Sequence, residues 1–204
     1  MESFSQHGED VAILELIDPA TSAFAVDVGA NDGQSWSNSY LFGQRGYHLL
    51  LIEPMPEYAR RCRQLYAGAA NVIVEEYAIS PELGEATFFV NTDAATDELA
   101  MRSSLARELV PSTRVQSIVV KTIPLGVLLE KHGWPSSYAF LSVDAEGFDL
   151  EVLKSAALDR YRPSVICVEE GEAHPSIADY LSGFAYTFVK TLGPNGLYVS
   201  GSQA

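Results

Sequence analysis

The stretch that decides the fold is Ala25–Phe42, AVDVGANDGQSWSNSYLF. An apolar run ends at Asp27 and Val28, a turn with glycines at positions 29 and 33 follows, and the next segment has helical spacing. A strand, a glycine turn and a helix in this order are typical of parallel α/β folds that hold a nucleotide-like ligand at the turn. Glycine lets the backbone adopt positive φ angles and approach a ligand closely. The stretch therefore predicts a ligand site.

Short apolar runs alternate with segments of helical spacing along the rest of the chain. Apolar runs without polar interruptions indicate strands that are covered on both faces. We predict strands over Ala23–Val28, Tyr47–Ile52, Asn71–Glu76, Ala139–Val143 and Ser164–Val168. We predict helices over Ser35–Gln44, Pro56–Ala67, Pro124–Lys131, Leu150–Leu158 and Pro175–Leu181. This alternation predicts an α/β fold, a doubly wound and mostly parallel sheet with helices on both faces.

Three segments depart from the alternation. Residues 1–22 form an amphipathic, helical opening segment. Glu85–Val90 and Val115–Thr122 have strand character and flank a polar insert, Asn91–Pro111, which we expect on the substrate side. The last segment, 184–200, contains Gly and Pro between two apolar runs and predicts an antiparallel hairpin. Nothing in the pattern indicates a linker, so we expect one domain over residues 1–204.

The composition narrows the class of protein. The chain has 204 residues, with 13 basic and 27 acidic residues and a formal net charge of -14. Such a charge repels phosphate backbones and anionic membranes, so nucleic-acid and membrane binding are disfavoured. The sequence has no apolar run of membrane-spanning length and no signal-peptide pattern, and we expect a soluble, cytoplasmic protein. Cys62 and Cys167 do not suggest a disulfide framework or a zinc site.

A second motif, LLLIEP, places Glu53 at the end of the next strand, about 20 residues after the turn. From this position an acidic side chain can accept hydrogen bonds from both ribose hydroxyls. Ribose occurs both in nicotinamide dinucleotides and in S-adenosylmethionine. The spacing G-A-N-D-G differs from the dinucleotide pattern, and Asp27 would repel a pyrophosphate while suiting an ammonium group. We therefore favour S-adenosylmethionine as the cofactor.

The chain resembles the FkbM family of methyltransferases through an ordered set of motifs: SQHGED, VDVGANDGQ, IEP, YAIS, SSL and VDAEGFDLEVLKSA. The resemblance covers Ser5 to Glu170. It implies a class I, Rossmann-like methyltransferase fold with a seven-stranded sheet and a reversed C-terminal hairpin. It also implies O-methylation, typically of hydroxyls on natural products or sugars. The chain departs from the family pattern at Pro124, where Asp is frequent, and at Ser142, where Lys is frequent.

The resemblance also implies which residues bind the cofactor. Four residues of the glycine turn would surround the methionine part, Glu53 would hold the ribose, and two residues after the third strand would lie near adenine. The cofactor-binding candidates are thus Asp27, Gly29, Asn31, Gly33, Glu53, Tyr77 and Ala78, together with Asp144.

Methyl transfer from a sulfonium needs alignment and at most the removal of one proton, so no nucleophilic triad is required. Asp144 and Glu146 follow the fourth strand and His7 lies before the first helix, and these three are the catalytic candidates. The favoured interpretation includes no metal. An alternative is a magnesium-assisted O-methyltransferase that uses Asp144, Glu169 and Glu170, with His174 nearby.

Two further interpretations stay open. The chain could be a non-catalytic module that binds S-adenosylmethionine, or an oxidoreductase that uses a nicotinamide dinucleotide. In the favoured interpretation the partner is a small-molecule or glycan acceptor. The sequence does not determine the oligomeric state, and a homodimer is one option.

Overall fold

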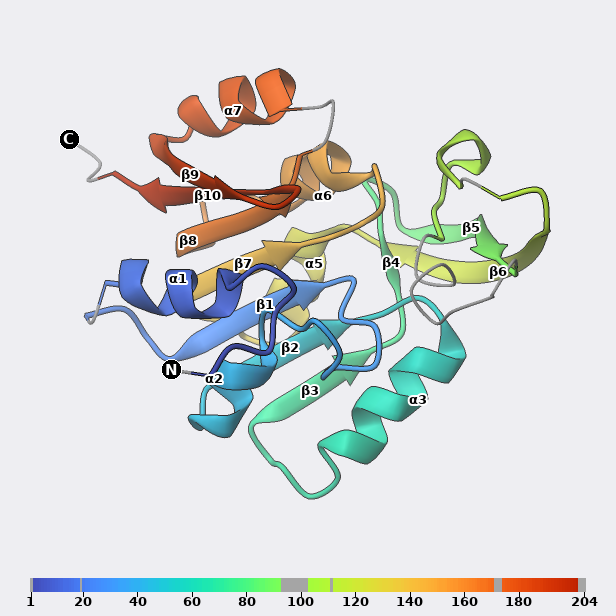
Figure 1. Cartoon of the computed structure of the whole chain (residues 1–204), viewed down its shortest axis with the longest axis horizontal. Helices are drawn as coiled ribbons and strands as arrows, with labels where there is room; N and C mark the ends of the chain where they lie inside the picture. The colour runs from blue at the N-terminus through green and yellow to red at the C-terminus, as the bar shows by residue number, and fades with distance from the viewer. Residues whose placement is uncertain (1, 19, 93–102, 111, 171–173, 202–204) are drawn as a thin grey trace.

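A seven-stranded sheet forms the centre of the computed structural model, which describes residues 2–18, 20–92, 103–110, 112–170 and 174–201 (Figure 1). The strand order is β3-β2-β1-β7-β8-β10-β9. The strands are β1 (Phe24–Val28), β2 (His48–Ile52), β3 (Val72–Glu75), β7 (Ser137–Val143), β8 (Arg162–Glu169), β9 (Tyr186–Leu192) and β10 (Asn195–Ser200). Strands β3, β2, β1, β7 and β8 are parallel to one another. Strands β10 and β9 form the antiparallel hairpin that the sequence predicts.

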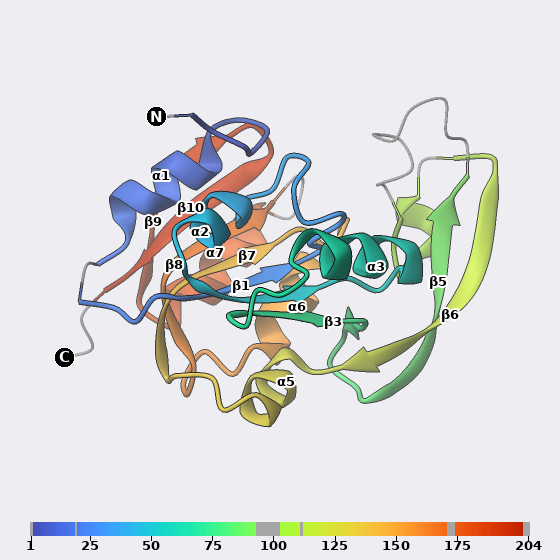
Figure 2. The same cartoon turned by 90° about the horizontal axis from the view of Figure 1, so that it is seen from below.

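Helices cover both faces of this sheet, as predicted (Figure 2). The first face packs against α1 (Glu9–Leu16), α2 (Tyr40–Gln44) and α3 (Pro56–Leu65). The second packs against α5 (Leu125–Lys131), α6 (Asp149–Ser155) and α7 (His174–Ser182). Side chains alternate across a strand, so neighbours in β2 enter different clusters, Leu49 the first and Leu50 the second. None of the described helices combines the length and the apolar character needed to cross a membrane.

A second sheet lies beside the first and consists of β4 (Ala78–Ile79), β6 (Val115–Ile123) and β5 (Gly84–Asn91), in that order (Figure 1). We call this sheet, with residues 103–110 and their short 3-10 helix Arg107–Leu109, the arm. Ser104 pairs with Phe89 of β5. The predicted strands on either side of the insert Asn91–Pro111 are confirmed, while residues 93–102 and 111 of that insert lie outside the described residues.

The predicted helix Ser35–Gln44 is wrong over its first half. The observed helix, α2, begins only at Tyr40. Trp36 has a φ of 53°, which a right-handed helix does not accommodate, and it pairs with Ser5 of the N-terminal segment. A contact with a distant part of the chain thus replaces local helical structure. Residues 35–39 are consequently a loop at the ligand edge of the sheet.

The close approach of β1 and β7 explains the glycine at position 29. Gly29 has a φ of 85°, and a Cβ atom there would lie 1.9 Å from the carbonyl oxygen of Asp144. That oxygen belongs to the backbone and cannot rotate away. A side chain at position 29 would therefore push the ends of the two strands apart.

We predict that Gly29→Ala lowers the free energy of unfolding by about 2 to 5 kcal/mol, from left-handed backbone strain and overpacking together. Gly68→Ala is the matched control, because Gly68 has a φ of 86° and a Cβ atom there would meet no other atom within 4 Å. It should carry the backbone strain alone. Urea denaturation of both variants measures the difference, and equal losses would show that the contact with Asp144 is unimportant.

Candidate active site

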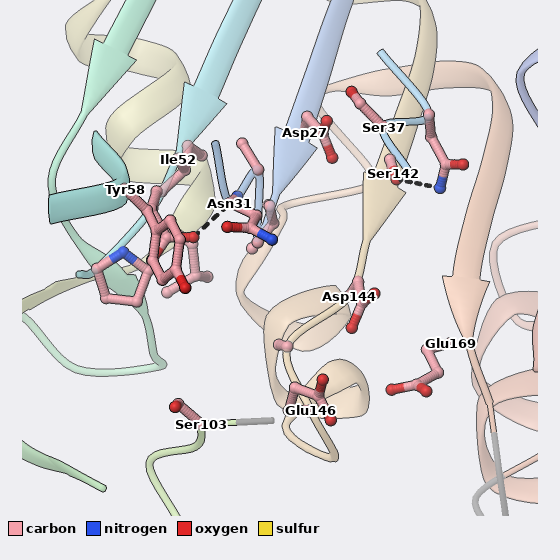
Figure 3. A pocket seen from close by; sticks show the side chains of 18 of the residues that line it. Asp27, Asn31, Ser37, Ile52, Tyr58, Ser103, Ser142, Asp144, Glu146 and Glu169 are labelled. Atoms are coloured by element: carbon pink, nitrogen blue, oxygen red, sulfur yellow. Dashed lines mark hydrogen bonds between the residues drawn. The ribbon is translucent and has the colours of Figure 1, made fainter. Parts of the chain in front are cut away.

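A cavity of about 400 Å³ opens at the carboxyl ends of β2, β1, β7 and β8 (Figure 3). Its walls also include parts of the N-terminal segment, the arm and the β9–β10 turn. Such a volume suits a small-molecule ligand. The predicted site residues that line it are His7, Asp27, Gly29, Asn31, Glu53, Tyr77, Ala78, Asp144 and Glu146. Gly33 does not line the cavity and instead packs near Cys62, whose Sγ would lie 3.1 Å from a Cβ atom.

Glu53 fixes the glycine turn to the end of β2. One carboxylate oxygen accepts a hydrogen bond from the Asn31 amide at 3.0 Å, and the other accepts one from the Met55 amide at 2.8 Å. The side chain is 6% exposed. Burial raises the pKa of Glu53 to about 7, an effect that these hydrogen bonds only partly offset. The predicted ribose-binding carboxylate is therefore also a structural element of the turn.

The backbone amides that follow β1 are used within the protein. The amides of Gly29 and Ala30 donate to the Ile52 carbonyl at 3.0 and 3.1 Å, and the Asn31 amide donates to Glu53. A pyrophosphate would need such amides to be directed toward it. By contrast, the buried Oδ1 of Asn31 has no hydrogen-bond partner within the described part of the chain. This oxygen can accept a bond from a ligand donor such as a hydroxyl or an ammonium group.

Asp27 lies in a buried polar group next to the turn. Its carboxylate accepts hydrogen bonds from the hydroxyls of Ser39, at 2.5 Å, and Ser142. Ser142 in turn accepts a bond from Asn38 Nδ2 at 3.1 Å. Burial raises the pKa of Asp27 to about 6 against the effect of these bonds. Ser142 is 1% exposed, so the residue that departs from the FkbM pattern supports Asp27 directly.

The loop after β7 directs a carboxylate into the cavity. Asp149, at the start of α6, accepts the amides of Ala145 at 2.8 Å and Gly147 at 3.0 Å, while the Glu146 amide donates to Asp144. The Asp144 side chain meets solvent through the cavity and faces Glu169 (Figure 3). Its pKa is raised to about 7 by desolvation among protein atoms, and then by the charge of Glu169.

The N-terminal segment contributes a buried carboxylate that the sequence did not single out. Glu9 is fully buried and accepts hydrogen bonds from Asn195 Nδ2 and from the His7 amide, both at 2.8 Å. The exposed His7 lies against the β9–β10 turn, because a Cβ atom on Gly193 would overlap its ring. In the sequence, the motif SQHGED, which contains Glu9, was the one indication that this segment contributes to the site. It could not indicate Asn195, the hydrogen-bond partner of Glu9, which is 186 positions away.

The three carboxylates of the magnesium alternative do not come together. Asp144 and Glu169 line the cavity, but Glu170 is buried elsewhere and accepts a hydrogen bond from the Tyr198 hydroxyl. Successive residues at a strand end point to opposite faces, which separates Glu170 from Glu169. Within the described residues, no group of three His, Cys, Asp or Glu side chains could hold a metal ion. The side chain of His174 lies outside the described part of the structure. The proposed ligand set was therefore wrong.

The arm supplies a further wall of the cavity. Phe88, Ser103 and Leu105 line the cavity together with Tyr77 and Ala78. Phe88 and Ala78 belong to one apolar cluster, with Leu105 packed against it. Ser103 and Leu105 belong to the SSL motif and to the insert that the sequence predicts on the substrate side, whereas no sequence pattern singled out Phe88.

The family model described as "Methyltransferase FkbM domain" matches residues 27–190. The chain therefore belongs to the FkbM methyltransferase family. The resemblance seen in the sequence motifs is confirmed. A comparison with curated proteins found no match.

Solved structures share the fold at low sequence identity. An FkbM methyltransferase from Methylobacillus flagellatus KT is 17% identical with a TM-score of 0.54, over 87% of this chain and 43% of that one. This chain thus spans less than half the length of that protein. A methyltransferase from Geobacter sulfurreducens is 11% identical with a TM-score of 0.52, over 98% and 81%. A precorrin-6y C5,15-methyltransferase from Geobacter metallireducens GS-15 is 12% identical with a TM-score of 0.50, over 98% and 90%. These likenesses confirm the class I methyltransferase fold.

The buried carboxylates predict how stability depends on pH. The folded-state pKa values of Asp27 and Glu53 are raised above their ordinary values, so the folded protein binds more protons than the unfolded chain between about pH 4 and about pH 7. In this interval their contribution to the free energy of unfolding falls as the pH rises. We expect the melting temperature of the ligand-free protein to fall across the upper part of this interval.

Asp27→Asn should flatten this dependence, because the amide oxygen can still accept from Ser39 without carrying a charge. Thermal melts of both proteins in matched buffers measure the slopes. A melting temperature that rises with pH, or an equal slope in the variant, would contradict the assignment.

Proposed function

We propose that this protein transfers a methyl group from S-adenosylmethionine to a hydroxyl of a carbohydrate or another small metabolite. The observation that carries the proposal is the position and chemistry of the cavity. It lies where the loops after the paired strands β1 and β7 diverge. Among the described residues, carboxylates line it and no Lys or Arg side chain does. Parallel α/β sheets bind ligands at this switch point. A cationic adenosyl ligand matches such a lining, whereas a pyrophosphate does not.

The residues fit the cofactor at each of its parts. Glu53, which directly follows β2, would accept hydrogen bonds from the ribose hydroxyls. Asn31 Oδ1, which has no partner among the described residues, offers a further acceptor. Asp27 would counter the ammonium of the methionine part. Tyr77 and Ala78, beside the apolar cluster of the arm, would contact adenine. When bound, S-adenosylmethionine supplies an electrophilic methyl group on a sulfonium.

Asp144 is the residue that we assign to proton removal. It faces the cavity at the end of β7, next to the junction that would hold the methionine part. A pKa of about 7 lets this carboxyl take a proton near neutral pH. The bond from the Glu146 amide holds its orientation. His7 and Glu146 line the same cavity and would contact the acceptor.

Glu53→Ala should weaken binding of S-adenosylhomocysteine by about 1 to 3 kcal/mol, through loss of charge-assisted hydrogen bonds and of the fixed turn. Glu57→Ala is the control, because Glu57 lies exposed on α3 and pairs with Arg61. Calorimetric titration of both variants, with NAD as a competing ligand, tests the cofactor. Unchanged affinity in the Glu53 variant would remove Glu53 from the site.

Asp144→Asn should lower kcat about 10² to 10⁴-fold, because an amide cannot remove a proton. In the parent enzyme kcat/KM should rise with pH through about 7, as Asp144 of the ligand-free protein loses its proton, and this limb should disappear in the variant. Glu151→Gln, on the outer side of α6 and paired with Lys154, is the matched control. Release of S-adenosylhomocysteine measures turnover. A variant that kept the parent pH profile would move the role of base to another residue.

A further inference from the structure

The proposed cofactor subsite lies at the β2 end of the cavity, and the cavity extends beyond it toward β8. Glu53 directly follows β2 and Glu169 ends β8, and β1 and β7 lie between these strands. Three strand spacings separate them by about 14 Å. We call the part of the cavity over β7, β8 and the β9–β10 turn the acceptor half. Its walls are Gln6, His7, Glu9, Trp36, Asp144, Glu146, Glu169, Pro194 and Asn195.

Four of these wall residues are carboxylates. Asp144, Glu146 and Glu169 point toward one another across the open volume (Figure 3). Glu9 lies at the N-terminal wall, and its charge is one of those that act on Asp144. Among the described residues no Lys or Arg lines the cavity, and Arg102 lies outside them. His7 contributes a basic side chain to the described part of this half.

Four hydrogen-bond donors near the acceptor half are directed to protein atoms. The amides of Ala145 and Gly147 donate to Asp149, and the Glu146 amide donates to Asp144. Asn195 Nδ2 donates to Glu9. An ionised carboxylate can only accept hydrogen bonds, so the carboxylates of this half present acceptors, beside the side-chain donors of Gln6 and Trp36. A ligand group that binds these carboxylates must bring the donor itself.

We propose that the acceptor substrate is a hydroxyl compound without an anionic group, and that a positively charged amino group beside the reacting hydroxyl strengthens its binding. This rests on the proposed function, whose cofactor occupies the other end of the cavity. A sugar hydroxyl or an ammonium group donates to the carboxylates of the acceptor half. A carboxylate, or a fully ionised phosphate, offers no donor and is repelled by the ionised carboxylates of the acceptor half.

The electrostatics of the acceptor half agree with this selection. Desolvation raises the pKa of Asp144, and the charges of Glu169, Asp27 and Glu9 raise it further. Each of these charges therefore opposes the ionisation of Asp144. A bound cation would reduce the repulsion, and an anion would increase it.

Three methyl glucosides that carry an ammonium, a hydroxyl or a carboxylate on the same exocyclic carbon test the proposal. Each is titrated into the full chain by calorimetry or ligand-observed NMR, with and without saturating S-adenosylhomocysteine. We expect the ammonium probe to bind about tenfold more tightly than the neutral one, and the carboxylate probe to bind most weakly. Glu169→Gln should reduce the ammonium preference several-fold. Glu151→Gln, outside the cavity, should keep it.

Binding of S-adenosylhomocysteine is measured first and tests the proposed function by itself. If it fails while the probes keep the expected order, the cofactor assignment is wrong and the charge selection stands. Equal or tighter binding of the carboxylate probe, or no binding of the ammonium probe, would overturn the charge selection. The order of probe affinities is measured on the parent protein, so the test does not depend on the folding of the Glu169 variant. If that variant did not fold, Glu146→Gln would take its place.

Discussion

The pairing of β1 with β7 is the constraint on which the cavity depends. The Asp144 amide donates to the Val28 carbonyl at 3.0 Å, and the space between the two strand ends admits only glycine at position 29. On one side of this pair the sheet continues through β2, and on the other through β8. The loops after β1 and β7 therefore diverge and leave an opening. Main-chain geometry, rather than attraction between the acidic side chains, brings Asp27 and Asp144 to one edge.

Among the residues that the structure describes, no Lys or Arg side chain lines the cavity beside those acidic side chains. Backbone amides and serine hydroxyls stabilise Glu53 and Asp27, yet burial still raises the pKa of both. The fold thus stores unfavourable electrostatic energy where the ligand binds, and a cationic ligand relieves it. The same arrangement is the basis of our proposal that the cavity takes a sulfonium cofactor at one end and a donor-rich acceptor at the other.

The sequence predicted the strands, most helices and the terminal hairpin because these follow from local patterns of apolar residues and turns. It also predicted the position of Glu53 beside the cavity, since parallel strands end at the same edge of a sheet. It failed for the first half of the helix at 35–44, because Trp36 takes its conformation from pairing with Ser5. It also failed for Glu170, which the alternation of β8 turns toward Tyr198. Both errors involve contacts between residues that are distant along the chain.

The sequence by itself determined the order of strands and helices, the glycine turn and the acidic strand ends, because these depend on residues near one another in the chain. It also carried the motifs that mark the FkbM family. Only the tertiary structure decided that Glu9 and Asn195 close one wall, that the arm closes another, and that Glu169 faces the cavity while Glu170 does not. The physical reason is that strand pairing and burial bring together segments that are far apart in the sequence, and local sequence patterns do not indicate which distant segments meet.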